Sequence, residues 1–271
     1  MRVFAKRMLY LIVGLYLALI VVAVFLSDRL IFLPHPSSYK DSSEIIKLTT
    51  RTGKRISAMY LSNPAAKFTL LVSHGNAEDI GDDRFWLEEL RRSGFSVLAY
   101  DYEGYGTSEG SPGEQVAYDD EESAYEYLTA NLHISPDHII IYGRSVGSGP
   151  AVHLAARKPA AGLILQSPFV SAFRVLTRIP LLPFDKFPNY KDIRQVRCPL
   201  LIIHGDSDTV IASWHGKKLY ELGNEPKKFV SIPGANHNDL EMVAGKKYME
   251  ALQQFAASVS QKQSQKVASS R

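Results

Sequence analysis

Short apolar runs alternate with longer amphipathic stretches along most of the 271-residue chain. Two opening runs flank a Gly-containing turn and predict an antiparallel strand pair, Ile45–Thr49 and Ile56–Leu61. Later runs rich in Val, Ile and Leu are typical of strands covered on both faces. They occupy residues 69–73, 96–100, 139–142, 162–166, 200–204 and 229–232, with helical patterns between them at 84–93, 116–131, 149–158, 213–222 and 246–258. This alternation predicts an α/β fold with a mostly parallel central sheet and helices on both faces.

The chain opens on a different pattern, an uncharged apolar stretch from Met8 to Leu26. A helix needs about 20 apolar residues to cross the hydrocarbon core of a bilayer, so this stretch predicts one transmembrane helix. Three basic residues precede it, and the positive-inside tendency then places the N-terminus in the cytoplasm and the main domain on the non-cytoplasmic side. The alternative is a cleaved signal peptide, for which Val24–Asp28 is a poor cleavage site.

These patterns predict that the chain consists of consecutive segments of different character. They are a basic N-terminus at 1–7, a transmembrane anchor at 8–27, a linker at 28–44, one α/β domain at 45–258, and a disordered polar tail at 259–271. Within the α/β domain, residues 168–196 break the strand-helix rhythm with several prolines and are expected to form a short apolar cap over one end of the sheet.

Composition narrows the functional classes only a little. A net charge of +3 offers no strongly basic face, which argues against a nucleic-acid partner. The single cysteine, Cys198, excludes an intramolecular disulfide and is expected to be a small core residue. Because the sequence has no Cys/His cluster, phosphate-binding loop or dinucleotide fingerprint, no cofactor and no metal are expected.

One motif carries chemistry, the segment Gly143-Arg144-Ser145-Val146-Gly147. A Gly-x-Ser-x-Gly pattern alone is weak, since it arises by chance in roughly one chain in ten of this length. Its context is stronger, because it follows a predicted strand and precedes a predicted helix, as a nucleophile elbow requires. Ser145 is therefore the candidate nucleophile. Arg144 is an unusual charged residue for the variable position and is expected to influence the mouth of the site.

A serine nucleophile needs a base and an acid, which in this strand-helix order follow it along the chain. His237 lies in a late loop after the last predicted strand and is the candidate base. The preceding strand ends in a loop with two carboxylates. Asp208 lies further into that loop and is the candidate acid, whereas Asp206 is expected to brace it.

Acyl transfer also requires donors for the developing oxyanion. The backbone N–H of Val146, next to the nucleophile, is the first candidate. The loop after the third strand should supply the second donor, from Asn76 or alternatively from Ala77. His74 in that loop is expected to pack beneath it as a structural residue.

Other polar groups are expected to be structural. The turn-rich loop at 101–108 should line the site and support the neighbouring loop, with no catalytic role for Asp101 or Ser108. The acidic run at 119–122 suits the beginning of a helix, where acids interact favourably with the helix dipole, better than it suits a metal site.

The chain resembles the α/β-hydrolase-domain proteins, specifically the family-17 branch known as palmitoyl-protein thioesterases. The similar stretches are LLVSHGNAEDIG, YDYEGYGTSEG, IIIYGRSVGSGPAVHLAAR, LIIHGDSDTVI and GANHNDLE. The resemblance implies an α/β-hydrolase fold, and its triad falls on Ser145, Asp208 and His237, the residues that the pattern also selects. Members of that branch reach membranes through a lipidated, cysteine-rich N-terminus, whereas this chain has an apolar helix there.

The leading functional expectation is a membrane-anchored serine hydrolase that cleaves ester or thioester bonds of acyl chains, in lipids or S-acyl proteins, through an acyl-enzyme. A serine peptidase of the same fold is one alternative, although such enzymes usually carry a larger cap or an added domain. A catalytically lapsed, anchored binding module is the other.

Overall fold

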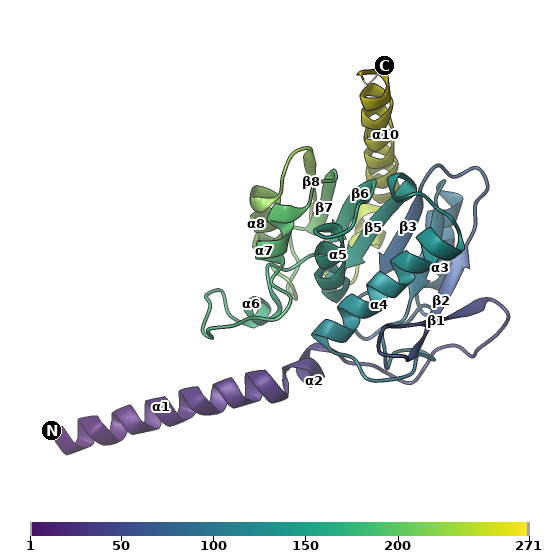
Figure 1. Ribbon diagram of the computed structural model, residues 1–271. Coiled ribbons are helices and arrows are strands. Elements are labelled where there is room, and N and C mark those ends of the chain that lie inside the picture. The colour runs from purple at the N-terminus through teal and green to yellow at the C-terminus, as the bar shows by residue number, and fades with distance from the viewer. Residues whose placement is uncertain (1, 270–271) are drawn as a thin grey trace.

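The computed structural model describes residues 2–269 as an α/β domain with one long helix projecting from it (Figure 1). Eight strands form one sheet in the order β1-β2-β4-β3-β5-β6-β7-β8. β2 pairs antiparallel with β1 and β4, and all the other pairings are parallel. The strands are β1 Ile45–Thr49, β2 Arg55–Leu61, β3 Thr69–Ser73, β4 Ser96–Tyr100, β5 Ile139–Arg144, β6 Gly162–Gln166, β7 Leu200–Gly205 and β8 Lys227–Ile232.

Helices cover both faces of this sheet, as the alternation of the sequence predicts. On one face Leu87 and Leu90 of α3 pack with Leu252 and Phe255 of α10, and on the other Ala124 of α4 and the apolar residues of α5 and α8 pack against the sheet. The helices are α1 Arg2–Phe25, α2 Ser27–Ile31, α3 Arg84–Arg92, α4 Glu114–Glu126, α5 Ser148–Ala155, α6 Ala172–Leu176, α7 Asn189–Asp192, α8 Trp214–Leu222, α9 Leu240–Ala244 and α10 Lys246–Ser269.

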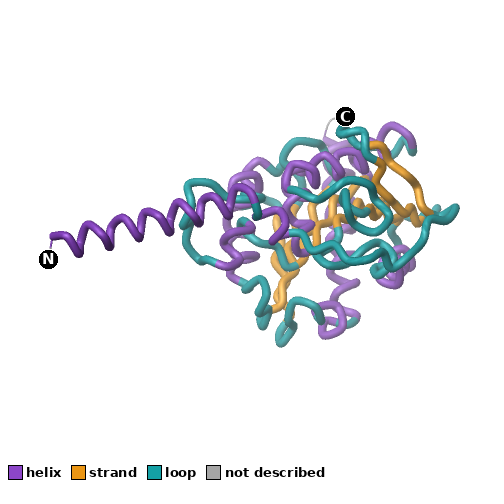
Figure 2. The backbone as a smooth tube through the Cα atoms, turned by 90° about the horizontal axis from the view of Figure 1, so that it is seen from below, coloured by secondary structure: helices purple, strands orange, loops and turns teal. Residues whose placement is uncertain are grey.

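The N-terminal helix α1 runs away from the domain and most of its apolar side chains are exposed (Figure 2). Its segment Phe4–Phe25 is long and apolar enough to cross a membrane. A one-turn helix, α2, then leads into the domain, so the predicted linker begins with regular structure. The predicted cap at 168–196 contains only the short helices α6 and α7 and a single 3₁₀ turn.

The C-terminal segment differs from the prediction. We expected disorder from residue 259, but α10 continues as one helix to Ser269. Tyr248, Leu252, Phe255 and Val259 recur along one side of α10 and are all buried, so the apolar stripe reaches one turn further than the polar composition suggested. Beyond it, the Gln263 side chain donates to the Asp137 carbonyl at 2.7 Å, which holds the polar part of the helix against the domain.

The elbow after β5 lies directly against the end of β3, because these strands are parallel neighbours with Ser73 paired to Gly143. A side-chain carbon added at Gly147 would lie 2.2 Å from the Ser73 carbonyl oxygen and 2.7 Å from that of His74. Neither backbone oxygen can move without shifting the strand end. This packing requires glycine at position 147.

Gly147→Ala should therefore destabilise the domain by about 1–3 kcal/mol through overpacking. Gly113→Ala is the matched control, since its added carbon meets nothing closer than a flexible carboxylate oxygen of Asp28 at 3.4 Å. Chemical denaturation of the detergent-solubilised chain measures both. Equal stability of the two variants would contradict the close approach of the elbow to β3.

Candidate active site

Ser145 occupies a strained turn between β5 and the helix that follows. Its φ of 53° lies in the left-handed region that non-glycine residues rarely adopt. A side-chain carbon at Gly143 would lie 2.5 Å from the Gly147 carbonyl oxygen, so the turn closes tightly on itself. Residues 145–147 form a single 3₁₀ turn that continues into α5, and the N-terminal end of this helical run lies at the serine. Its dipole favours negative charge there.

The structure brings together the three residues selected from the sequence. His237 Nε2 lies 2.9 Å from Ser145 Oγ, and His237 Nδ1 lies 2.8 Å from Asp208 Oδ2. Both distances are those of hydrogen bonds. The three side chains come from the loops after β5, β7 and β8, which meet at the carboxyl edge of the sheet.

Asp208 is held rigidly in this chain of hydrogen bonds. Its Oδ1 accepts from the backbone N–H groups of Val210 and Ile211 at 2.9 and 2.7 Å. Burial alone would raise the pKa of Asp208, but hydrogen bonds from His204 and His237 outweigh it and hold the pKa well below its usual value. The carboxylate is therefore ionised at neutral pH and oriented towards His237.

Asp206, the other carboxylate in this loop, bonds to different groups from Asp208. Asp206 Oδ1 accepts from the backbone N–H of Gly234 at 2.8 Å and from the Ser207 hydroxyl at 3.0 Å. It thus joins its own loop, which the sequence predicted it would brace, to the loop that carries His237. Asn236 reinforces the same junction, because its side-chain oxygen accepts from the N–H groups of Thr209 and His237.

The loop after β3 lies close to the serine, since a side-chain carbon added at Gly75 would lie 3.6 Å from Ser145 Cβ. His74 Nδ1 lies 2.7 Å from the Gly75 carbonyl oxygen, and because the next peptide bond is trans, the Asn76 N–H points the opposite way. The Ala77 N–H is already donated to Asn76 Oδ1 at 3.0 Å. This favours Asn76 over Ala77 as the second oxyanion donor. The Val146 N–H lies in the first turn of a helical run, where no intrahelical partner is available.

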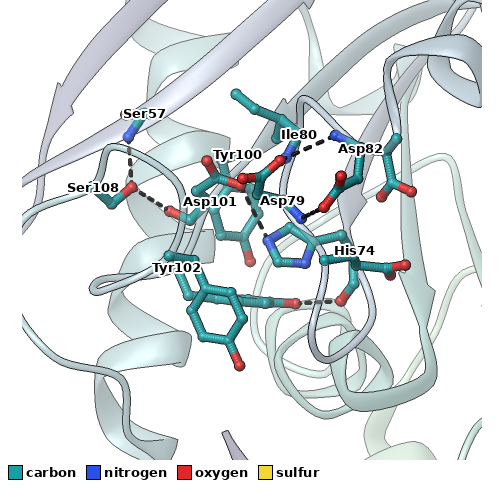
Figure 3. A network of polar contacts seen from close by, with 12 residues as sticks. Ser57, His74, Asp79, Ile80, Asp82, Tyr100, Asp101, Tyr102 and Ser108 are labelled. Carbon is teal, nitrogen blue, oxygen red and sulfur yellow. Dashed lines mark hydrogen bonds and ion pairs between the residues drawn. The ribbon is translucent and has the colours of Figure 1, made fainter. Parts of the chain in front are cut away.

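Beneath this loop lies a buried polar network (Figure 3). His74 Nε2 is 3.4 Å from Asp101 Oδ1, and both side chains are almost fully buried. Burial lowers the pKa of His74, but Asp101 overrides it and the pKa is raised. Asp101 Oδ1 also accepts from the Ile80 N–H at 2.9 Å, and the Ser108 hydroxyl donates to the Asp101 carbonyl at 3.0 Å. These groups support the loop, in line with the structural roles expected for them.

Arg144 does not face the mouth of the site, contrary to our expectation. Its guanidinium bonds to Asp83 Oδ1 at 2.6 Å and to Glu78, lies 3.5 Å from Glu241 Oε1, and stacks 4.7 Å above the Trp86 ring. Glu78 in turn accepts from the Gly75 N–H. Arg144 therefore links the elbow to the oxyanion loop. No local pattern indicated this, because Glu78 and Asp83 lie 66 and 61 residues away in the sequence.

Comparison with known proteins decides the family. Two curated relatives are α/β-hydrolase domain-containing protein 17B from Xenopus laevis, 41% identical, and from Homo sapiens, 40% identical; each alignment covers 82% of this chain and 78% of the relative. The 17C protein of Mus musculus is 39% identical over 79% of this chain. The chain belongs to the α/β-hydrolase domain-containing protein 17 family. A broader family model, described as serine aminopeptidase, S33, matches residues 64–183.

Solved structures place this member of the family in the α/β-hydrolase fold. An esterase from Pyrococcus furiosus, Pf2001, superposes with a TM-score of 0.70 over 82% of this chain and 98% of its own, at 18% sequence identity. An α-β serine hydrolase homologue from Coxiella burnetii gives a TM-score of 0.63, also at 18% identity. At these identities the likeness establishes the fold, and the hydrolase class rests on it together with the family match.

An apolar pocket adjoins the site. It has a volume of about 360 Å³, at the small end for ligand pockets, and its lining includes Val146 and Asn76, the two candidate oxyanion donors. The remaining walls come from α1, α2, the segment 169–185, and Val210 and Ile211 in the loop after β7.

A group of residues with metal-ligand chemistry lies outside the triad. His35, Asp79 and Asp82 place their ligand atoms within 4.8 Å of one another. The Asp79 carboxylate already accepts hydrogen bonds from the backbone N–H groups of Ser38 and Gly81, at 2.8 and 2.9 Å. This group therefore functions as a turn brace that joins the linker to the loop before α3.

Arg144→Met tests the buried ion cluster. It leaves three carboxylates without their cation and should cost about 3–5 kcal/mol of stability at neutral pH. Burial and Glu78 already raise the pKa of Asp83 to about 6 even with Arg144 present. Without Arg144 the folded-state pKa of Asp83 rises further above its unfolded value, and the pKa of Glu78, which Arg144 lowers, rises as well, so the loss must grow from pH 5 to pH 8.

Arg144→Lys keeps the charge and is the control. Denaturation at both pH values checks the sign of the effect. A loss that is independent of pH, or larger at pH 5, would show that the three carboxylates do not depend on Arg144.

Proposed function

We propose that this chain is a membrane-anchored serine hydrolase that cleaves ester or thioester bonds of acyl chains through an acyl-enzyme. The observation that carries the proposal is the hydrogen-bonded series Ser145–His237–Asp208. The apolar pocket at the same place supports an acyl substrate. The N-terminal helix α1 supports anchoring, and the basic residues before it favour a cytoplasmic N-terminus with the domain on the other side.

The chemistry follows from the geometry. Ser145 Oγ attacks the substrate carbonyl carbon while His237 Nε2 accepts the hydroxyl proton. Asp208 stabilises the resulting imidazolium and keeps Nδ1 protonated. The N–H groups of Val146 and Asn76 donate to the oxyanion, and His237 then passes its proton to the departing alkoxide or thiolate. Water, activated by the same imidazole, attacks the acyl-enzyme and releases the acid.

Ser145→Ala should abolish covalent labelling by a fluorophosphonate probe and lower kcat on p-nitrophenyl acyl esters by about 10⁶-fold, to background. A membrane-impermeant probe on intact cells adds the sidedness, since it should label the wild type without lysis. The same variant must retain wild-type stability in denaturation. Labelling that survives Ser145→Ala would refute the assignment of the nucleophile, and wild type that never labels would favour a lapsed binding module.

Asp208→Asn tests the acid separately. The amide preserves shape but favours the wrong tautomer of His237, so kcat should fall by about 10⁴-fold with little change in KM. Asp206→Asn is the matched control two residues away, and its amide oxygen still accepts from Gly234. Steady-state kinetics of both variants decide the question. If kcat falls by a similar factor in both variants, Asp208 is not the acid of the triad.

A serine peptidase is the second candidate, because the matching family model describes a serine aminopeptidase. The short cap between β6 and β7 favours acyl esters instead, since it adds only two short helices and a 3₁₀ turn above the sheet. Aminoacyl p-nitroanilides separate the two candidates. Hydrolysis of these amides at a kcat/KM above that of acyl esters would establish the peptidase.

A further inference from the structure

The apolar pocket is built jointly by the anchor helix and the cap. Leu19, Val22 and Ala23 of α1 line one wall, and their spacing of three and four residues places them on one side of the helix. Phe173 and Leu181, from the segment between β6 and β7, line the facing wall. Ala23 is buried although nearly all of its neighbours in α1 are exposed, so the wall is in contact with the domain.

Hydrogen bonds join this end of the anchor to the catalytic loop. The Asn76 side chain donates to the Ile31 carbonyl at 2.6 Å and accepts from the Leu33 N–H at 2.9 Å. Asn76 is the residue whose backbone N–H is the candidate second oxyanion donor. The segment that leaves the anchor therefore bonds directly to the residue that completes the candidate oxyanion hole.

The cap is tied to the anchor as well. The Tyr16 hydroxyl donates to the Leu181 carbonyl at 3.2 Å, and the Lys186 ammonium lies 3.0 Å from Asp28. Beside these contacts the cap exposes a large apolar edge, with Leu176 91% and Ile179 63% exposed. In Figure 1 the region around α6 lies on the same side of the domain as α1. If α1 spans a bilayer, that edge lies beside it within the membrane, because Tyr16 is near the middle of the apolar segment Phe4–Phe25, and the apolar side chains of the edge there avoid water.

We infer that the last turns of α1 form part of the acyl-binding pocket, and that a long acyl chain enters between anchor and cap directly from the bilayer. This inference rests on the proposed acyl hydrolase function and adds the route and the specificity-determining residues. A chain that passes from hydrocarbon into an apolar pocket never exposes its methylene groups to water, which removes the main penalty for extracting it. Val146 and Asn76 are part of the pocket lining, so one part of the pocket lies next to the elbow, where the carbonyl would be attacked.

Substitutions in adjacent positions of α1 test the inference. Val22, 40% exposed, lines the pocket, whereas Val21, 55% exposed, does not line it and lies about 100° away around the helix. Val22→Phe and Val21→Phe make the same change in residue type and keep the helix apolar. The full chain is reconstituted in phosphatidylcholine vesicles and assayed with p-nitrophenyl butyrate and p-nitrophenyl palmitate.

Val22→Phe should reduce kcat/KM for palmitate by about tenfold and leave butyrate nearly unchanged, while Val21→Phe should match wild type on both. Ala23→Phe, one residue further along the wall, should repeat the selective loss. Butyrate turnover reports the intact triad, so a variant that misfolds loses both activities and is recognised. Dipalmitoyl phosphatidylcholine and an S-palmitoyl peptide are then assayed as alternative substrates. The one that is hydrolysed faster shows whether the palmitoyl chain comes from a lipid or from a protein.

The outcomes separate the two proposals. If Val22→Phe and Ala23→Phe keep the wild-type ratio of palmitate to butyrate hydrolysis, the anchor is no part of the pocket and the inference fails, although Ser145-dependent hydrolysis stands. If wild type hydrolyses neither ester and does not label at Ser145, the proposed function fails and the inference falls with it. The inference is supported only if both Val22→Phe and Ala23→Phe lose palmitate hydrolysis while they keep butyrate hydrolysis.

Discussion

The close approach of two backbone segments at the carboxyl edge of the sheet is the constraint on which the site depends. The elbow after β5 and the end of β3 come so near that a single methyl group at Gly147 would collide with the carbonyl oxygens of Ser73 and His74. Parallel pairing of β3 with β5 creates this contact, and the loop that follows β3 then lies close to Ser145 at Gly75. The positions of the candidate nucleophile and of the loop that carries the candidate oxyanion donor are therefore one feature of the sheet, not two independent ones.

Buried polar groups maintain that contact against the tendency of loops to move. Below the oxyanion loop His74 pairs with Asp101, and beside it Arg144 pairs with Glu78 and Asp83. Breaking such pairs leaves a buried charge without a partner, which is far more costly than losing an exposed ion pair. The catalytic edge is thus held by electrostatic contacts that link the elbow to residues from β3, β4 and the loops that follow them.

Much of this was predictable because it depends on local patterns. Apolar runs revealed the eight strands, and the Gly-x-Ser-x-Gly setting with the later Asp208 and His237 selected side chains that the structure brings within hydrogen-bond distance. The partners of Arg144 and the pocket shared by α1 and the cap were not predictable in this way, because each depends on contacts between segments remote in the sequence that no periodicity or motif encodes. The apolar periodicity of α10 does continue to Val259, but the bond from Gln263 to Asp137 beyond it is a contact of the same remote kind.

The central claim is that Ser145 carries the acyl group during turnover, and peptide mass spectrometry after rapid acid quenching of the reaction with p-nitrophenyl palmitate tests it most directly. A palmitoyl adduct on the peptide that contains Ser145, formed at the rate of the initial p-nitrophenol release, is the predicted result. Release of p-nitrophenol with no adduct on that peptide, or with the acyl group on Cys198, would contradict it.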